Sequence, residues 1–195
     1  MQHPNKKITD LRRLRKLYED GAVFTAFDTE TTGITPTNSR IIEIGAVRFT
    51  KDGILSKWSH LFFPDQILSP FIISLTHITQ EMVDAADPIN EHLPGFLNFI
   101  KDTVLVAHNA QFDLNFLNAE CENCRLPVTK NYAVDTLQLS RCIFPEAERH
   151  KLDFLADMLG IDKGSSHRAF DDAVTCMELF KICMQSERIM NLKRI

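Results

Sequence analysis

The chain has 195 residues, of which 44% are hydrophobic and 25% are charged, and its net charge at pH 7 is −4. This length and composition are ordinary for one soluble globular domain with a single large core. Its apolar stretches are all shorter than the roughly 18 residues that a helix needs to cross a bilayer, and residues 1–7 are polar, unlike the apolar core of a signal peptide. We therefore expect a cytoplasmic protein with no membrane partner.

The charge is distributed unevenly along the chain. Residues 1–20 and residues 181–195 each carry a net charge of +3, so the stretch between them carries −10. Such a stretch is a poor surface for holding long nucleic acid by charge alone. It suits a site in which carboxylates are neutralised by metal ions.

Residues 9–20 are predicted to form a short amphipathic helix that begins at Thr9 or Asp10. One face is apolar and the other is basic, with Arg12 and Lys16 among its cations. The favoured interpretation is a helix packed on the domain with its basic face in solvent, and the alternative is an arm that binds phosphate. The expected organisation is a basic helical extension over 1–21, a main domain over 22–185 and a short tail over 186–195.

The main domain begins with three predicted strands, over 23–28, 41–49 and 53–63, and a hairpin turn joins the last two. Pro64 and Pro70 mark a loop, and helical patterns follow around 80–85 and 91–100. Strands over 103–107 and 132–135 then alternate with helices over 111–124 and 136–143, and helices over 151–159 and 169–184 end the domain. This order predicts a mixed sheet with helices on its faces, in an α/β or an α+β architecture.

Two carboxylates stand at the end of the first predicted strand. Asp28 and Glu30 point to the same face of that strand because side chains alternate with period two. The apolar run before them indicates a buried central strand, where unpaired carboxylates are costly, rather than a solvated strand end. Oxygen ligands without Cys or His suit a hard ion such as Mg²⁺ or Mn²⁺. The pair therefore predicts part of a metal site.

Further candidates lie after later elements. Asp113 follows the strand over 103–107, so we expect it in the crevice at the carboxyl end of that strand, although Asp113 or Asn109 would serve equally well as a helix cap. His167 precedes the last long helix and suits a general base near a metal site. Asp171 and Asp172 both follow it, and spacing alone does not decide which of them joins the site.

Three segments resemble the exonuclease motifs of the DnaQ-like family of DEDDh 3′–5′ exonucleases, which includes the proofreading epsilon subunit of bacterial DNA polymerase III. They are Asp28-Thr29-Glu30-Thr31-Thr32-Gly33, His108-Asn109-Ala110-Gln111-Phe112-Asp113 and His167-Arg168-Ala169-Phe170-Asp171-Asp172-Ala173. The stretches at 134–136 and 151–156 add to the resemblance, which covers roughly residues 22–185. Three motifs in the family's order are far more specific than any one of them alone.

The resemblance implies a ribonuclease-H-like fold, with a five-stranded mixed sheet flanked by helices. It also implies a reaction assisted by two divalent cations, Mg²⁺ or Mn²⁺. In the family's pattern, Asp28 contacts both cations, Glu30 and Asp172 complete the first cation site, and Asp113 supports the second.

The third motif supplies the general base, which by resemblance is His167. The family places its last aspartate five positions after this histidine, and that spacing selects Asp172. Asp171 is then a charge that is favourable near the N-terminus of the last long helix.

The resemblance also implies which residues contact the substrate, namely Thr31, Thr32, Gly33, Ile34, His108, Asn109 and Phe112. Ile34 stands where relatives wedge an apolar side chain against the terminal bases, and ordinary loop packing is the alternative. His77 departs from the family's pattern, because relatives usually have a Gly at this position before an Ile-Thr pair. We interpret His77 as non-catalytic.

The leading hypothesis is a metal-dependent 3′–5′ exonuclease that releases nucleoside 5′-monophosphates from the 3′ ends of single-stranded DNA, with a DNA polymerase as a possible partner. An RNA-trimming exonuclease of the same family is one alternative, and a non-catalytic module that binds a polymerase is another. Two threonines before Gly33 favour DNA, because they resemble the first motif of proofreading enzymes.

Overall fold

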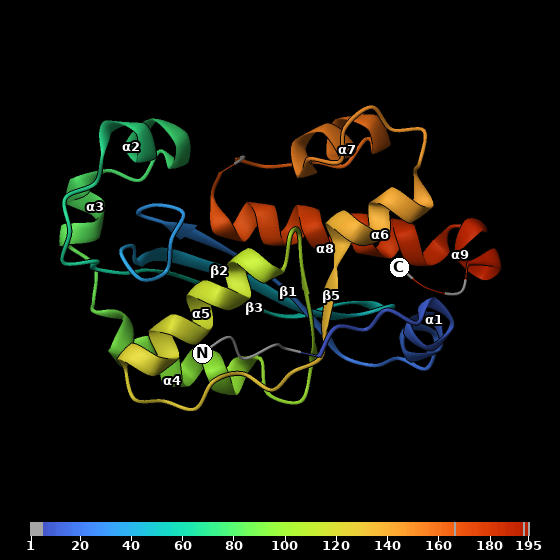
Figure 1. The fold of residues 1–195 in the computed structure, drawn as a ribbon, viewed down its shortest axis with the longest axis horizontal. Coiled ribbons are helices and arrows are strands. Elements are labelled where there is room, and N and C mark those ends of the chain that lie inside the picture. Colours follow the sequence, from blue (N-terminus) through green and yellow to red (C-terminus); the bar gives the residue numbers. More distant parts are fainter. Residues whose placement is uncertain (1–5, 166, 193, 195) are drawn as a thin grey trace.

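The computed structural model describes residues 6–165, 167–192 and 194, and its centre is a five-stranded mixed sheet with the strand order β3-β2-β1-β4-β5 (Figure 1). Strands β1 (Phe24–Thr31), β2 (Ile41–Thr50) and β3 (Gly53–Leu61) pair antiparallel. Strands β4 (Val104–Ala107) and β5 (Ala133–Asp135) continue the sheet in parallel with β1. The predicted mixed sheet is confirmed.

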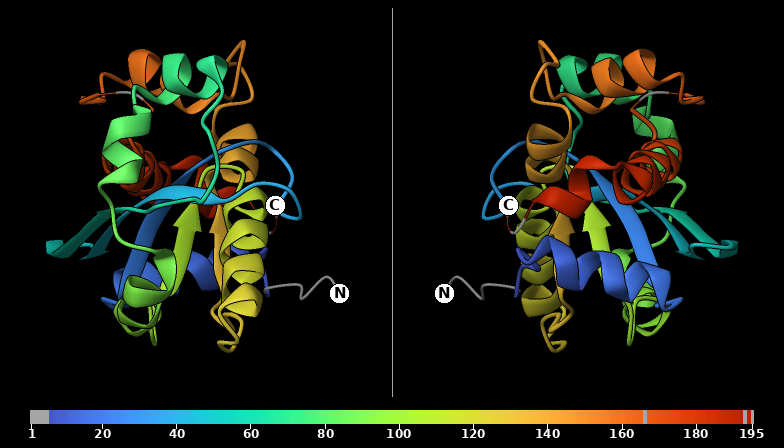
Figure 2. Two further views of the ribbon diagram at one scale, coloured as in Figure 1. Left: turned by 90° about the vertical axis from the view of Figure 1, so that its left-hand side faces the viewer. Right: turned by 90° about the vertical axis from the view of Figure 1, so that its right-hand side faces the viewer.

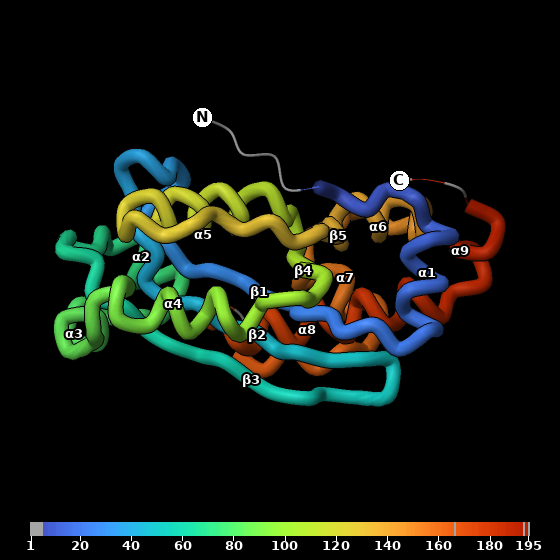
Figure 3. The backbone as a smooth tube through the Cα atoms, turned by 90° about the horizontal axis from the view of Figure 1, so that it is seen from below, coloured from blue at the N-terminus to red at the C-terminus, as the bar shows by residue number. Residues whose placement is uncertain are grey.

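Helices cover both faces of this sheet (Figures 1 and 3). On one face lie α4 (Ile89–Phe99) and α5 (Gln111–Asn123), and on the other lie α6 (Thr136–Ile143), α7 (Leu152–Leu159) and α8 (Ala169–Gln185). The strand period of two divides the core accordingly, since Phe24 and Ala26 pack with the α8 side and Phe27 packs with the α4 and α5 side.

The N-terminal helix α1 (Leu11–Glu19) packs on the α8 side of the sheet. Asp10 caps it, since one carboxylate oxygen accepts the backbone N–H groups of Arg12 and Arg13 at 3.0 and 3.1 Å. Leu11 and Leu14 are fully buried in the same core as α8, while the basic face stays outside. A short helix that the sequence did not predict, α9 (Arg188–Asn191), lies beside α1 near the C-terminus. The boundaries at 21 and 185 stay a prediction.

One predicted loop is wrong over part of its length. The residues from Pro70 onward form helix α2 (Pro70–Thr76), which is followed by α3 (Gln80–Asp84). Ser69 caps α2, and Pro70 occupies its first turn, where its missing N–H costs nothing. The helix ends at His77 in the left-handed conformation, with φ of 57°. Glycine adopts this conformation at the end of a helix without steric cost.

Strand β1 extends beyond its neighbour β4 at its carboxyl end. Strand β4 pairs with β1 only along residues 24–26, so the last residues of β1 extend past its end. In Figure 2, the carboxyl ends of β4 and β5 point toward the side of the molecule that carries α2 and α7. The first turn of α8 lies directly on β2 there, because a Cβ on Gly45 would overlap the backbone of Ala169 and Phe170. Among the described residues, no helix is long and apolar enough to cross a membrane.

Candidate active site

Strand β1 carries two carboxylates in the part that extends beyond β4. Asp28 pairs with Gly45 of β2, and Glu30 pairs with Glu43 of the same strand. Directly paired residues of antiparallel strands share a face, so Asp28 and Glu30 lie on the side that α8 covers. The intervening residue, Thr29, points to the opposite face. The predicted same-face arrangement of the two carboxylates is therefore present.

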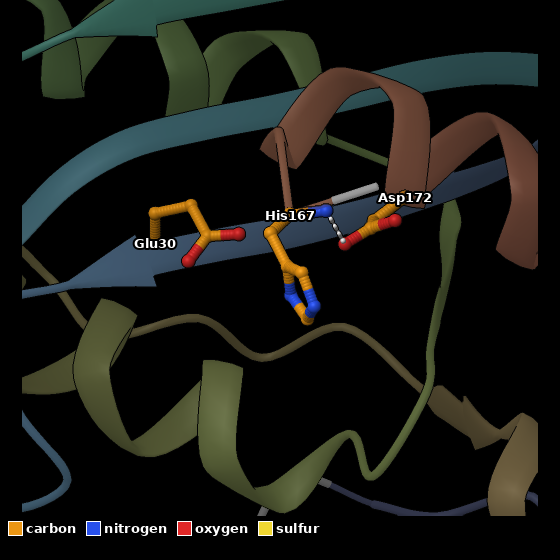
Figure 4. A group of neighbouring side chains, drawn as sticks. All are labelled: Glu30, His167 and Asp172. Carbon is orange, nitrogen blue, oxygen red and sulfur yellow. Dashed lines mark hydrogen bonds between the residues drawn. The ribbon is translucent and has the colours of Figure 1, made fainter. Parts of the chain in front are cut away.

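The third motif meets this pair at the start of α8. Glu30, His167 and Asp172 each place a potential ligand atom within 4.8 Å of the other two (Figure 4). The backbone N–H of His167 donates to Asp172 Oδ2 at 3.2 Å, which fixes the turn before α8. His167 itself is in the left-handed region, with φ of 62°. On its outer side, Nε2 lies 3.9 Å from Oδ2 of Asp153, a residue of α7.

Asp113 reaches the same region from the other face of the sheet. Its Oδ1 accepts the backbone N–H of Thr29 at 3.0 Å and the hydroxyl of Thr29 at 2.8 Å, and the residue is 2% exposed. The N-cap of helix α5 is Ala110 and no side chain caps the helix, so the helix-cap alternative is wrong for both Asn109 and Asp113. The carboxylate of Asp113 belongs instead to the β1 cluster.

Burial and mutual repulsion raise the pKa values of the whole carboxylate cluster. The pKa of Asp28 is raised well above its usual range, first by burial and then by the charges of Asp113 and Glu30. Burial, with the charge of Asp172, raises the pKa of Glu30 to about 8. Burial also raises the pKa of Asp113 to about 7, against the hydrogen bonds from Thr29, and that of Asp172 to about 6, against the charge of His167. Converging carboxylates of this kind fit hard divalent cations, which remove the repulsion.

These pKa values predict how the stability of the metal-free protein depends on pH. An unfolded carboxyl group titrates near pH 4, whereas Glu30 and Asp113 titrate at about 8 and about 7 in the folded protein. Between these limits the folded state binds more protons, so stability is present at pH 5 and is lost as the pH rises toward 8. With a chelator, we expect the melting temperature to fall by the order of 10 °C over this interval, since about 1 kcal/mol corresponds to 2–4 °C.

Differential scanning fluorimetry from pH 5 to pH 8.5 measures this effect. Adding Mg²⁺ at pH 8 should recover most of the lost melting temperature, because the cation binds only the folded cluster. Glu30→Gln removes one of the titrating groups and should flatten the chelator curve. A melting temperature independent of pH in chelator would contradict the assignment of the cluster.

Asp171 and Asp172 point into different surroundings. Asp172 lines a cavity together with Asp28 and His167. Asp171 lines a separate cavity on the β3 side, and its Oδ2 accepts the backbone N–H of Ser165 at 2.8 Å. This geometry supports Asp172 as the residue of the site and gives Asp171 a structural role in the preceding turn.

A buried ion pair that sequence analysis missed holds the start of α8 in place. Glu43 is 1% exposed and accepts two hydrogen bonds from Arg168, at 2.7 and 3.2 Å, and one from the backbone N–H of Ala169 at 2.9 Å. The same contacts fix the backbone directly after His167, at the start of the helix that carries Asp172. A signal was present in the sequence, because Glu43 is the one charge within the apolar run over 41–47, and a charge inside a buried strand needs a partner.

The residues predicted to contact substrate fall into two groups. Most of them line an open, largely apolar cavity of about 450 Å³ beside Glu30, namely Thr31, Thr32, Gly33, Ile34 and Phe112. Phe71 and Leu75 of α2 complete its wall. Ile34 is 86% exposed and Phe71 is 70% exposed, so packing of the loop does not account for Ile34. Its role as a wedge stays a prediction.

His108 and Asn109 form the second group, next to the cavity that contains Asp172. His108 Nε2 lies 2.8 Å from the carbonyl oxygen of His150, and its Nδ1 lies 3.0 Å from the hydroxyl of Thr136. Burial lowers the pKa of His108, so the neutral ring donates from Nε2 and accepts at Nδ1. The ring therefore joins β4 to the segment before α7. Asn109 is exposed in the left-handed conformation, and its contact with substrate stays a prediction.

Comparison with known proteins agrees with this site. A family model described as Exonuclease matches residues 25–180. The chain is 46% identical over 159 residues to DNA polymerase III subunit epsilon of Treponema pallidum, a match that covers 80% of this chain and 74% of that protein. The zinc-bound complex of E. coli exonuclease I with single-stranded DNA has a TM-score of 0.78 at 17% identity, covering 88% of this chain and 42% of that chain.

A second solved structure, the nuclease domain of 3′hExo bound to rAMP, has a TM-score of 0.73 at 24% identity and covers 90% of this chain and 96% of that chain. It is described as a DEDDh family member. At these identities both structures show the fold alone, and the family rests on the sequence matches. The chain belongs to the exonuclease family, as a DnaQ-like 3′–5′ exonuclease.

Proposed function

We propose that this exonuclease removes nucleoside 5′-monophosphates from the 3′ ends of single-stranded DNA, in proofreading or repair. The observation that carries the proposal is the convergence of Glu30, His167 and Asp172 within 4.8 Å, beside Asp28 and Asp113. The relative from Treponema pallidum is a DNA polymerase subunit, and exonuclease I was solved with single-stranded DNA. Both support DNA as the substrate, and the first supports a polymerase as a partner. A cytoplasmic location stays a prediction.

The carboxylates fit two divalent cations, Mg²⁺ or Mn²⁺. Four carboxylates with pKa values raised by burial and by one another form an all-oxygen donor set, which is the set that hard cations prefer. We assign Asp28 to both cations, Glu30 and Asp172 to the first and Asp113 to the second. When bound, such cations supply charge that stabilises the attacking and leaving oxygens of an in-line displacement.

The chain's own residues perform the remaining steps. His167 accepts a proton from the attacking water as the water oxygen bonds to phosphorus. The bond from phosphorus to the 3′ oxygen of the shortened strand breaks, that oxygen takes a proton from a solvent water to become the new 3′-hydroxyl, and His167 returns its proton to solvent. Asp153, 3.9 Å from Nε2, stabilises the imidazolium that forms. Glu43 and Arg168 hold the backbone that carries His167. The apolar cavity with Ile34 and Phe71 receives the terminal base, for which a sequence-blind apolar surface is suited.

A direct assay tests the proposal. A 5′-labelled single-stranded DNA of 20 nucleotides is incubated with the protein and Mg²⁺, and we expect a ladder that shortens from the 3′ end, with nucleoside 5′-monophosphates as products and no reaction in chelator. A matched RNA should be degraded at least about tenfold more slowly. Faster degradation of RNA would favour the exoribonuclease alternative, and internal cuts or 3′-phosphate products would contradict the proposed reaction.

A further inference from the structure

A second cavity opens from the carboxylate cluster on the side away from the apolar one. Its volume is about 640 Å³, and Asp28, His167 and Asp172 form one wall. Cations line the cavity as well. They are Arg141 from α6 and, from the segment between α6 and α7, Arg149 and Lys151, and we name these three residues the basic wall.

The basic wall is anchored to the sheet. The carbonyl oxygen of His150, between Arg149 and Lys151, accepts a hydrogen bond from His108 Nε2 at 2.8 Å. The imidazole of His150 in turn lies 3.1 Å from the hydroxyl of Ser140 in α6. These two bonds tie the segment to His108, just after β4, and to α6, so the backbone positions that carry Arg149 and Lys151 are fixed next to the site before any ligand arrives. Such placement reduces the ordering cost of binding.

The side chains of the basic wall are available for a ligand. Arg141, Arg149 and Lys151 are exposed, and within the described residues none of the three has a carboxylate within 4.0 Å. Other cations near the site are already paired, such as Arg168 with Glu43. Two carboxylates outside the cluster, Glu148 and Asp153, line the same cavity and partly offset the cations.

The two cavities differ in chemistry and meet at the carboxylates. Glu30 borders the apolar cavity, and Asp28 and Asp172 border the basic one. A strand end that crosses the cluster therefore meets an apolar surface that suits bases in one cavity and a cationic surface that suits phosphates in the other. We propose that the basic wall binds the backbone phosphates of the substrate strand on the 5′ side of the scissile bond.

This inference rests on the proposed exonuclease function and adds a source of affinity for strands longer than one nucleotide. The middle of the chain carries a net charge of −10, so binding by overall charge is weak. The three cations beside the cluster supply the electrostatic attraction for phosphates that the overall charge does not. The rate should accordingly rise with strand length until the phosphates that the wall reaches are present.

The double variant Arg149→Ala/Lys151→Ala tests the inference with two substrates. One is a single-stranded DNA of ten nucleotides, and the other is the p-nitrophenyl ester of thymidine 5′-monophosphate, which has no phosphate beyond the reacting one. We expect the ratio of kcat/KM for the DNA to that for the ester to fall roughly tenfold or more, mainly through KM. The slope of log kcat/KM against log salt for the DNA should become shallower by about 0.7 per lost contact.

One variant serves as a control, and a second tests the opposite change in charge. Arg12→Ala removes an exposed arginine of α1 that does not line this cavity, and the substrate ratio should stay that of the wild type. Glu148→Gln removes the opposing charge and should lower KM for the DNA. An unchanged ratio and salt slope in the double variant would overturn the inference, as would an equal loss on both substrates. If the wild type hydrolyses neither substrate, the proposed function itself has failed.

Discussion

Asp28→Asn is expected to lose kcat by about 10³-fold or more and to unfold at a higher temperature than the wild type in chelator. The two effects have one cause. Burial, and then the charges of Asp113, Glu30 and Asp172, raise the pKa of Asp28 well above its usual range. Its carboxylate is needed to hold cations, and it is a source of repulsion when they are absent. The amide that Asp28→Asn introduces has the same shape but no charge, so it removes both the affinity for cations and the repulsion by the neighbouring carboxylates.

The measurement combines the DNA ladder assay with melting curves, each with and without Mg²⁺. In chelator at pH 8 the variant should melt several degrees above the wild type, and Mg²⁺ should raise its melting temperature less. Asp52→Asn, in the exposed turn between β2 and β3, is the control and should match the wild type in both assays. The assignment fails if Asp28→Asn keeps more than about a tenth of the activity or melts lower than the wild type in chelator.

His167→Gln should reduce kcat by about 10²- to 10⁴-fold at neutral pH, which is the range for loss of a general base. The rate of the variant should rise with pH more steeply than that of the wild type, because hydroxide replaces the missing proton acceptor. Asp153→Asn should give a smaller loss, since Asp153 acts through the imidazole at 3.9 Å. His77→Asn, at the end of α2, is the matched control and keeps a residue that tolerates the left-handed conformation.

Melting curves distinguish a base from a ligand at this position. His167 lies close enough to Glu30 and Asp172 to hold a cation with them. If His167 is a base, His167→Gln should keep the rise in melting temperature that Mg²⁺ gives to the wild type. Loss of that rise would show that His167 is a ligand, and the proposed step would have to be revised.

The strands and carboxylates were predictable because short-range patterns determine them. The period-two alternation of β1 placed Asp28 and Glu30 on one face, and the position of Asp113 just after β4 placed it at the same edge of the sheet. Helix α2 was missed because Pro70 was interpreted as a loop marker. A serine followed by a proline is a helix-start signal, and Ser69 with Pro70 could have predicted the start of α2.

Long-range contacts were not predictable from one sequence. Glu43 and Arg168 are 125 positions apart, and only the packing of α8 on β2 at Gly45 brings them together. The basic wall likewise depends on the bond between His108 and the carbonyl of His150, 42 positions away. No periodicity in either segment indicates these pairings. Family resemblance supplied the candidate site residues but not the contacts that hold them.

Because α8 packs on β2, the parts of the fold form in a definite order as the chain is synthesised. Strands β1, β2 and β3 form local hairpins that can pair while the ribosome is still making the rest of the chain. The nuclease site is different, because Glu30 meets His167 and Asp172 only after α8 has been made and has docked. A nascent chain therefore carries its acidic strand without His167 and Asp172 beside it until α8 has docked.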